Sequence, residues 1–172
     1  MNPAAFFAQV HSAFGKLDQS QVDGINTLLT ALAALPLTHQ AYLLSTCWHE
    51  TAKTMQPIAE YGRGHGRLYG APAGQYGHIY YGRGYVQLTW LANYQKAGLA
   101  TGRDLVQFPD QALDPDIAAQ ILVKGCEQGW FTGHRLADYS NYTDMRRVIN
   151  GTDKAGAIAG YARAFEKALN AK

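Results

Sequence analysis

The segment from Tyr61 to Gly84 restricts the fold of this chain more than any other part of it. It contains eight glycines and shows no apolar periodicity. Glycine loses more conformational entropy on folding than any other residue, so such a segment favours neither a long helix nor a regular strand. Long irregular segments in compact domains usually form binding loops. We therefore expect a surface segment that builds a ligand-binding cleft.

Apolar residues at helical spacing flank this segment on both sides. Before it, the pattern predicts helices over residues 3 to 14 and 21 to 34. A third helix is capped by Thr38 and ends just after Glu50, because Pro57 forbids its continuation. After the segment, helices are expected around residues 89 to 98, 115 to 128, 142 to 149 and 154 to 171.

Strand signals are weak. Short stretches near residues 78 to 81 and 85 to 88 are the only candidates, so any sheet is a small hairpin. The predicted fold class is therefore mainly α, with many helices and at most a small β-hairpin. The absence of repeats and linkers, with 47% hydrophobic residues, indicates one domain over residues 1 to 172.

Charge and chain pattern exclude several classes of partner. A net charge of +2, from 15 basic and 13 acidic residues, is far from the concentrated charge that nucleic-acid binding needs. Residues 1 to 13 lack the basic and apolar regions of a secretory signal, and no segment approaches the roughly 18 apolar residues of a membrane span. We expect no nucleic acid, no stable membrane association and synthesis in the cytoplasm.

Cysteine and histidine spacing indicates neither a disulfide scaffold nor a metal centre. Cys47 and Cys126 lie in apolar helical contexts typical of buried thiols, although the sequence leaves a bridge between them open. His49-Glu50 lacks the second histidine of a zinc peptidase, because Lys53 occupies that position. Cys47 and His49, two apart on a helix, point to different sides and do not form a nucleophile and base pair. We expect no metal and no organic cofactor, with a zinc amidase of scattered ligands as an open alternative.

The segment Cys47-Trp48-His49-Glu50-Thr51 carries an ionisable pair in the last turns of an apolar helix. Burial beside Trp48 and the negative end of the helix dipole both disfavour a charged Glu50 carboxylate. A carboxyl group that keeps its proton near neutral pH can act as a general acid. The alternative for a lone glutamate is a solvated residue at a helix end.

A second carboxylate follows ten residues later on a loop. Glu60 lies beyond Pro57, so it projects from a different element than Glu50 does. Two carboxylates about 6.5 to 9.5 Å apart across a cleft leave room for one attacking water, which is the arrangement of an inverting glycosidase. The alternative is an exposed loop glutamate, because spacing in the sequence does not fix this distance.

Aromatic and amide side chains follow the glycine-rich segment. The run from Tyr80 to Trp90, continued by Asn93-Tyr94, places rings beside glycines and polar side chains two to four residues apart. Such rings stack on sugars while amides and hydroxyls bind their substituents. An aromatic core hairpin with polar edges is an equal alternative on composition.

Together these motifs closely resemble glycoside hydrolase family 19, the chitinase and phage-endolysin family of lysozyme-like fold. The resemblance spans roughly residues 25 to 170. It rests on four motifs in the right order, which are His49-Glu50-Thr51, Glu60-Tyr61-Gly62, Tyr81-Gly82-Arg83-Gly84 through Gln87-Leu88-Thr89 to Asn93-Tyr94, and Arg147-Val148-Ile149-Asn150-Gly151.

The resemblance implies roles for individual residues. Glu50 is expected as the acid, Glu60 as the base, and Thr89 as the hydroxyl residue that helps Glu60 to hold the water. The residues expected around the sugar are His49, Tyr61, Tyr81, Gln87, Trp90, Asn93, Tyr94 and Asn150.

Two departures from the plant chitinases favour peptidoglycan over chitin. The two glutamates are closer in sequence than in the plant enzymes, as in the endolysin branch, and the many cysteines of those enzymes are missing. The plant enzymes' substrate-binding arginine also has no clear match in the last helix, where Arg163 is the nearest stand-in.

The expected function is an endolysin-type lysozyme that cuts between N-acetylmuramic acid and N-acetylglucosamine, without a separate cell-wall-binding module. We expect a monomer that reaches the wall through a separate holin-type protein. Three alternatives stay open, namely a chitinase, a catalytically inactive peptidoglycan-binding or chitin-binding module, and a lytic transglycosylase, which needs only one glutamate.

Overall fold

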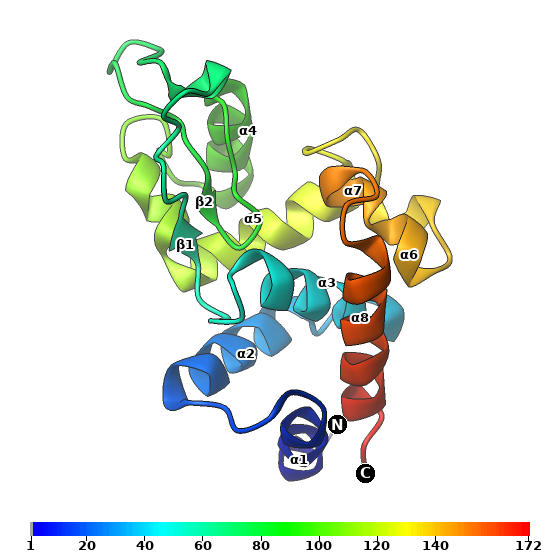
Figure 1. Cartoon of the computed structure of the whole chain (residues 1–172). Coiled ribbons are helices and arrows are strands. Elements are labelled where there is room, and N and C mark those ends of the chain that lie inside the picture. The colour runs from blue at the N-terminus through cyan, green and yellow to red at the C-terminus, as the bar shows by residue number, and fades with distance from the viewer. Residues whose placement is uncertain (1) are drawn as a thin grey trace.

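The computed structural model describes residues 2–172 and is built mainly of helices (Figure 1), which confirms the predicted fold class. The α-helices are α1 (Pro3–Phe14), α2 (Gln19–Leu32), α3 (Leu37–Glu50), α4 (Leu91–Thr101), α5 (Pro115–Gln128), α6 (Tyr142–Met145), α7 (Arg147–Asn150) and α8 (Ala155–Leu169). Three short 3₁₀ helices are η1 (Leu68–Gly70), η2 (Pro109–Leu113) and η3 (Leu136–Asp138). Two strands, β1 (Ile58–Ala59) and β2 (Arg83–Gly84), complete the fold.

The predicted helices are present, with local corrections. α1 and α5 begin and end where the pattern placed them, and Asp114 caps α5 by accepting from the backbone N–H groups of Asp116 and Ile117. Thr38 does not cap α3, because the helix already starts at Leu37 after Pro36. The helix expected over 142 to 149 is two short helices, α6 and α7.

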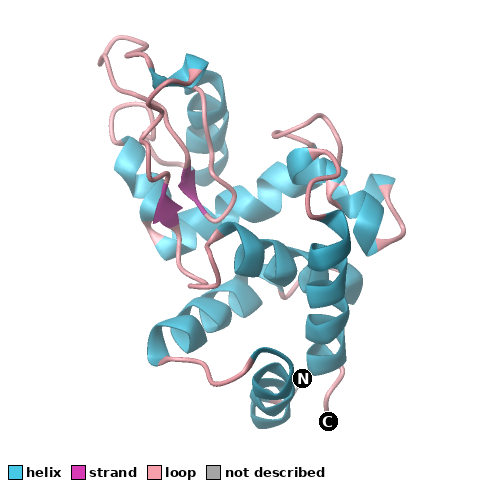
Figure 2. Cartoon of the chain, in the orientation of Figure 1, coloured by secondary structure: helices cyan, strands magenta, loops and turns pink. Residues whose placement is uncertain are grey.

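The sheet differs from the predicted hairpin. β1 pairs antiparallel with β2, so the sheet joins residues on the two sides of the glycine-rich segment (Figure 2). The stretches near residues 78 and 88 contribute only isolated bridges, Ala73 with His78 and Arg83 with Leu88. Apolar alternation was a poor guide here because strands of two residues are set by long-range pairing.

The chain forms two lobes that share α5. We call residues 58–113 the loop lobe, and residues 2–57 with 129–172 the helical lobe (Figure 1). Ala118, Leu122 and Cys126 of α5 belong to the core of the helical lobe, while Ile117 and Ile121 pack in the core of the loop lobe. One helix with two apolar faces therefore fixes the lobes relative to each other.

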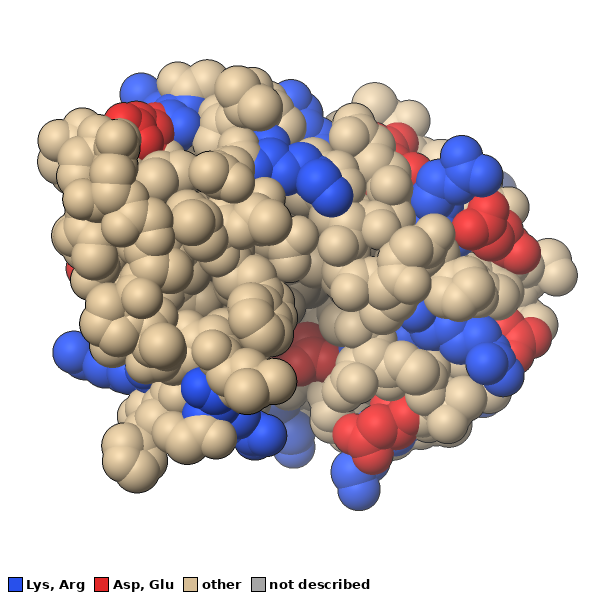
Figure 3. Space-filling view, turned by 90° about the horizontal axis from the view of Figure 1, so that it is seen from above, with Lys and Arg blue, Asp and Glu red and all other residues tan. Residues whose placement is uncertain are grey.

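A groove separates the lobes on one side of the molecule, and an acidic surface lies at its base (Figure 3). α3 forms the floor, and its residues from Ala41 to Trp48 are buried, with α8 as the main neighbour of this helix. Cys47 and Cys126 are free, buried thiols, as expected of core residues. Among the described residues, no helix is long and apolar enough to cross a membrane.

The chain leaves α3 through a turn with unusual backbone angles. Ala52, Lys53 and Met55 all have positive φ values of 50°, 72° and 56°. Such conformations cost non-glycine residues about 1 kcal/mol or more each, so surrounding contacts must hold them. The buried Thr51 hydroxyl does so by donating to the Cys47 carbonyl and accepting from the Met55 N–H.

Gly24 of α2 packs directly against this turn. A Cβ atom at residue 24 would lie 1.9 Å from the Met55 carbonyl oxygen. The backbone would have to move to relieve this steric clash. We therefore predict that Gly24→Ala lowers the free energy of unfolding by about 1 to 3 kcal/mol, as in overpacked cores.

Gly160→Ala is the matched control, because this glycine lies in α8 with nothing near the added Cβ. It should raise stability by about 0.5 to 1 kcal/mol through helix propensity. Chemical denaturation measures both. Equal effects of the two substitutions would contradict the close contact between α2 and the turn.

Candidate active site

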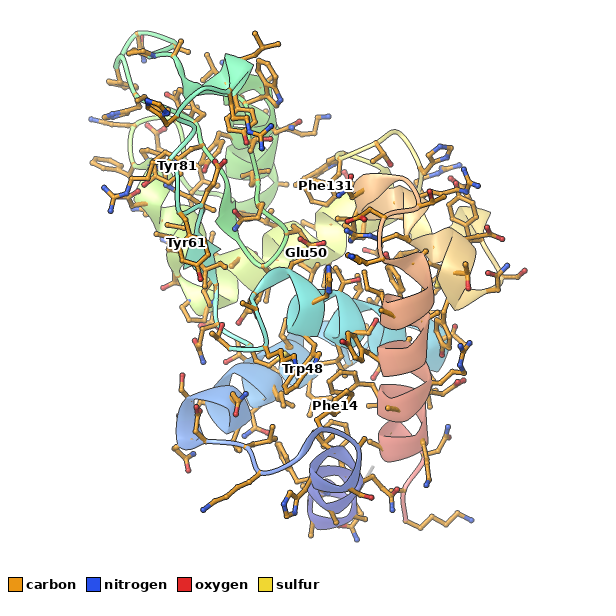
Figure 4. All side chains as sticks on the ribbon, viewed as in Figure 1. Phe14, Trp48, Glu50, Tyr61, Tyr81 and Phe131 are labelled. Atoms are coloured by element: carbon orange, nitrogen blue, oxygen red, sulfur yellow. The ribbon has the colours of Figure 1, made fainter. Side chains whose placement is uncertain are left out.

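Glu50 is the last residue of α3 and lies between the two lobes (Figure 4). Its side chain is 20% exposed, and its Oε1 accepts a hydrogen bond of 2.6 Å from Nη1 of Arg146. Arg146 is 1% exposed and also donates from Nε to the Asp153 carbonyl. The second oxygen of Glu50, Oε2, has no hydrogen bond within the described residues and is the one available to a ligand.

The expected influence of Trp48 on Glu50 is wrong. Trp48 packs on Phe14 and Phe165, with ring centroids 4.8 and 6.4 Å away, on the other side of α3 from Glu50 (Figure 4). Residues two apart on a helix do not share a face. The charged neighbour that contacts Glu50 is Arg146.

Glu60 follows β1 in the loop lobe and is held by two donors. The Tyr69 hydroxyl donates to Oε1 at 2.9 Å and the Gly82 N–H donates to Oε2 at 3.2 Å. Both bonds stabilise a carboxylate, which is the form that a general base needs. The pKa of Tyr69 lies above its ordinary value, because partial burial and then the bond to Glu60 keep its proton in place.

The strand register places Glu60 beside Gly82. Ala59 pairs with Arg83, which pairs in turn with Leu88. One residue further, Glu60 lies opposite Gly82, and the Glu60 N–H donates to the Gly82 carbonyl at 2.7 Å. Beyond Leu88 the register shifts, because the Trp90 N–H donates to the Tyr80 carbonyl. Thr89 follows Leu88 directly and so lies at the end of this pairing.

The space beside the Gly82 Cα is filled by Gln87, because a Cβ atom at residue 82 would lie 2.7 Å from the Gln87 Oε1 atom. The half-buried Thr89 hydroxyl makes no hydrogen bond within the described residues. A bound water would satisfy this hydroxyl.

Gln87 and Trp90, the residues on either side of Leu88 and Thr89, have positive φ values of 54° and 69°. The Gln87 amide nitrogen donates to the carbonyls of Ile58 and Gly84, so this side chain ties the strands together. Trp90 is 46% exposed, and its ring meets the edge of Tyr69 at 5.7 Å. Trp90 therefore exposes its ring to solvent beside Tyr69, the residue that donates to Glu60.

Tyr94 does not lie where it can touch a sugar, which corrects the expectation. It is fully buried in the loop-lobe core. Its hydroxyl donates to the Tyr81 carbonyl at 2.7 Å and accepts from Nη1 of Arg83 at 3.0 Å. Tyr94 fixes the backbone next to Gly82, and hence the donor to Glu60.

The other predicted sugar contacts differ in exposure. Tyr61 is 92% exposed, and Figure 4 shows it on the loop lobe with Tyr81. The remaining three come from three different elements, with half-buried His49 on α3, half-buried Asn93 on α4 and exposed Asn150 at the end of α7. The site thus draws on both lobes.

Comparison with known proteins shows which family the chain belongs to. Residues 41–151 match the profile of glycoside hydrolase family 19, described as chitinase class I. The chain belongs to this family. The matched range includes Glu50, Glu60, Thr89, Arg146 and Asn150.

A curated relative, an acidic endochitinase of Petunia hybrida, is 40% identical over 112 residues, or 64% of this chain. The chain spans 40% of the length of that relative. Two solved structures share the fold at 24% identity and cover 96% of this chain. They are a bacterial family 19 chitinase, with a TM-score of 0.70 and 94% of its own chain covered, and chitinase C of Streptomyces griseus HUT6037, with 0.69 and 76%.

Arg163 is not the arginine of this site. It is exposed on α8, near Tyr142 and Glu166, whereas the arginine that meets Glu50 is Arg146. Sequence reasoning missed Arg146 and Tyr69. The motif from Arg147 to Gly151 begins one residue after Arg146, and only packing shows which of the two adjacent arginines is buried. Tyr69 lies in the segment without apolar periodicity.

Tyr69 gives a direct test of how Glu60 is held. Tyr69→Phe removes one of two donors to the carboxylate while keeping the ring against Trp90. Loss of a hydrogen bond to a charged group costs about 1.5 to 3 kcal/mol, so turnover should fall about ten- to a hundredfold.

Tyr139→Phe, in the helical lobe, is the control and should leave turnover unchanged, since its hydroxyl makes no hydrogen bond within residues 2–172. The measurement is the initial rate of each variant and of the wild-type protein on the same soluble substrate. A Tyr69→Phe variant as active as the control would remove Tyr69 from the site.

Proposed function

We propose that this protein hydrolyses β-1,4 glycosidic bonds of an N-acetylated cell-wall polysaccharide, with Glu50 as the acid and Glu60 as the base. One observation carries the proposal. The two carboxylates come from different lobes, and each has partners suited to its role. Glu50 keeps one oxygen free beside a buried arginine, while Glu60 is held by two donors.

Glu50 must gain a proton before it can act. In the structure its carboxylate is paired with Arg146, which leaves Oε2 for the proton and for the glycosidic oxygen. A sugar bound in the groove excludes water from Glu50 and adds a hydrogen-bond acceptor at Oε2, and both effects favour the protonated form. Glu50 then gives this proton to the leaving oxygen as the glycosidic C–O bond breaks.

Glu60 and Thr89 act on the water. The water oxygen attacks the anomeric carbon from the face opposite the leaving group, and its proton passes to Glu60. Tyr69 and Gly82 each use one acceptor position of the carboxylate, which has about four, so Glu60 can still accept from the water. Glu50 returns to its pair with Arg146 after the transfer.

Peptidoglycan, with cleavage between N-acetylmuramic acid and N-acetylglucosamine, is the substrate we favour. The support for it is the short spacing between the glutamates and the small number of cysteines, as in the endolysin branch of the family. An endolysin that reaches the wall through a holin-type protein, and that acts as a monomer, stays a prediction.

Chitin is the second candidate. The similar proteins are described as chitinases, namely the Petunia endochitinase and the two bacterial enzymes. Chitin and peptidoglycan share the N-acetylglucosamine unit, so one groove can accept either backbone. Peptidoglycan differs from chitin because every second sugar is N-acetylmuramic acid, which carries a lactyl group and a peptide.

Product analysis separates these functions. Purified peptidoglycan and chitin are each digested by the wild-type protein and by Glu50→Gln, and fragments are identified by mass spectrometry. We expect reducing-end fragments from peptidoglycan, faster than from chitin, and no detectable product with Glu50→Gln, because the amide keeps the shape but donates no proton to the sugar.

Glu127→Gln on the exposed side of α5 is the control and should keep full activity. Products from chitin alone would make the protein a chitinase. Anhydro-sugar products would indicate a transglycosylase, and no product from either polymer would leave only a binding module.

A further inference from the structure

The loop lobe carries a second hollow that contains neither glutamate. It has a volume of about 770 Å³, within the usual range of ligand pockets, and its walls include Arg63, His78, Tyr81, Arg83, Phe108 and Asp110. It begins next to the Glu60 loop, because the Arg63 N–H bonds the Glu60 carbonyl and Tyr81 precedes Gly82.

Three cross-links make the hollow rigid. A His78 ring nitrogen lies 3.0 Å from the Gln107 carbonyl, and the Tyr80 hydroxyl donates to the Val106 carbonyl at 2.9 Å. Arg83 donates from Nε to Asp110 at 2.7 Å. These contacts join the wall around residues 77–83 to the wall around residues 107–111, so a ligand meets a preformed site and loses less entropy on binding.

Two guanidinium groups at this hollow have N–H donors without a hydrogen-bond partner in the described residues. Arg83 is 4% exposed and uses Nε and Nη1 in its bonds, while its Nη2 makes none within residues 2–172. Arg63 is exposed, and its side chain makes no hydrogen bond or ion pair within the same residues. Asp110 offsets one of these charges, and its Oδ2 remains free of a partner there. The lining therefore carries a net positive charge with one carboxylate oxygen available.

An apolar surface completes the set of binding groups. Phe108 is a large apolar residue that is 52% exposed. Tyr81 is backed by the Arg83 guanidinium, whose carbon lies 3.5 Å from the centroid of its ring. A ligand that fits has carboxylates for the two arginines, an amine for Asp110 and aliphatic surface for Phe108.

We propose that this hollow binds the peptide stem attached to the muramic acid of peptidoglycan, which has carboxylates, a diamino acid and small apolar side chains. The proposal rests on the proposed peptidoglycan hydrolase function and adds a basis for selectivity. Chitin is neutral and has no group for Arg63 or Asp110. The hollow thus adds affinity for peptidoglycan outside the catalytic groove.

Binding to a soluble stem tests this. The probe is an N-acetylmuramoyl tripeptide ending in diaminopimelic acid, titrated calorimetrically into the Glu50→Gln protein, with chitotetraose as the neutral probe. Arg63→Ala and Phe108→Ala should each weaken binding of the tripeptide about tenfold, the effect of one charge-assisted hydrogen bond or one apolar contact. Binding of chitotetraose should not change.

Arg103→Ala and Leu99→Ala are the matched controls, since both side chains are exposed elsewhere in the loop lobe. They should leave both affinities unchanged, and melting temperatures show that all four variants fold. Unchanged tripeptide affinity in Arg63→Ala and Phe108→Ala, or equal losses for both probes, would overturn the proposal. Peptidoglycan hydrolysis by the wild-type protein is measured separately, so a failure of the hollow is distinguishable from a failure of the proposed function.

Discussion

The ion pair between Glu50 and Arg146 joins segments that are 96 residues apart and closes the base of the groove. A guanidinium that is 1% exposed needs acceptors, because an unpaired buried charge costs several kcal/mol. Glu50 and the Asp153 carbonyl supply them, so the end of α3 and the turn before α8 must meet in this place. The pair is therefore both a structural requirement and the setting of the candidate acid.

The opposite side of the groove depends on a different interaction. Glu60 is placed by backbone pairing, through the register that aligns it with Gly82. Arg83 and Tyr94 hold this backbone from within the loop-lobe core. The glycine-rich segment therefore has a defined backbone conformation near Glu60, because a buried arginine and a buried tyrosine hold its end. α5 then sets one lobe against the other.

The sequence predicted the parts of this structure that depend on local patterns. The bounds of α1 and α5 followed from apolar spacing and capping residues, and the candidate carboxylates followed from their contexts and from the family resemblance. What it did not predict depends on contacts between distant residues. No periodic pattern in the sequence indicates the pairing of β1 with β2, the hydrogen bond from Tyr69 to Glu60 or the burial of Tyr94. The assumed role of Trp48 failed because neighbours in sequence do not share a helix face.

The central claim is that Glu60 activates a water while Glu50 protonates the leaving group. Because this water must attack opposite the leaving group, a β-linked substrate must first yield an α-product. NMR of the freshly released reducing end, recorded on a soluble oligosaccharide before mutarotation, measures this directly. The account predicts the α-anomer first, whereas an initial β-anomer would mean retention and would contradict the role given to Glu60.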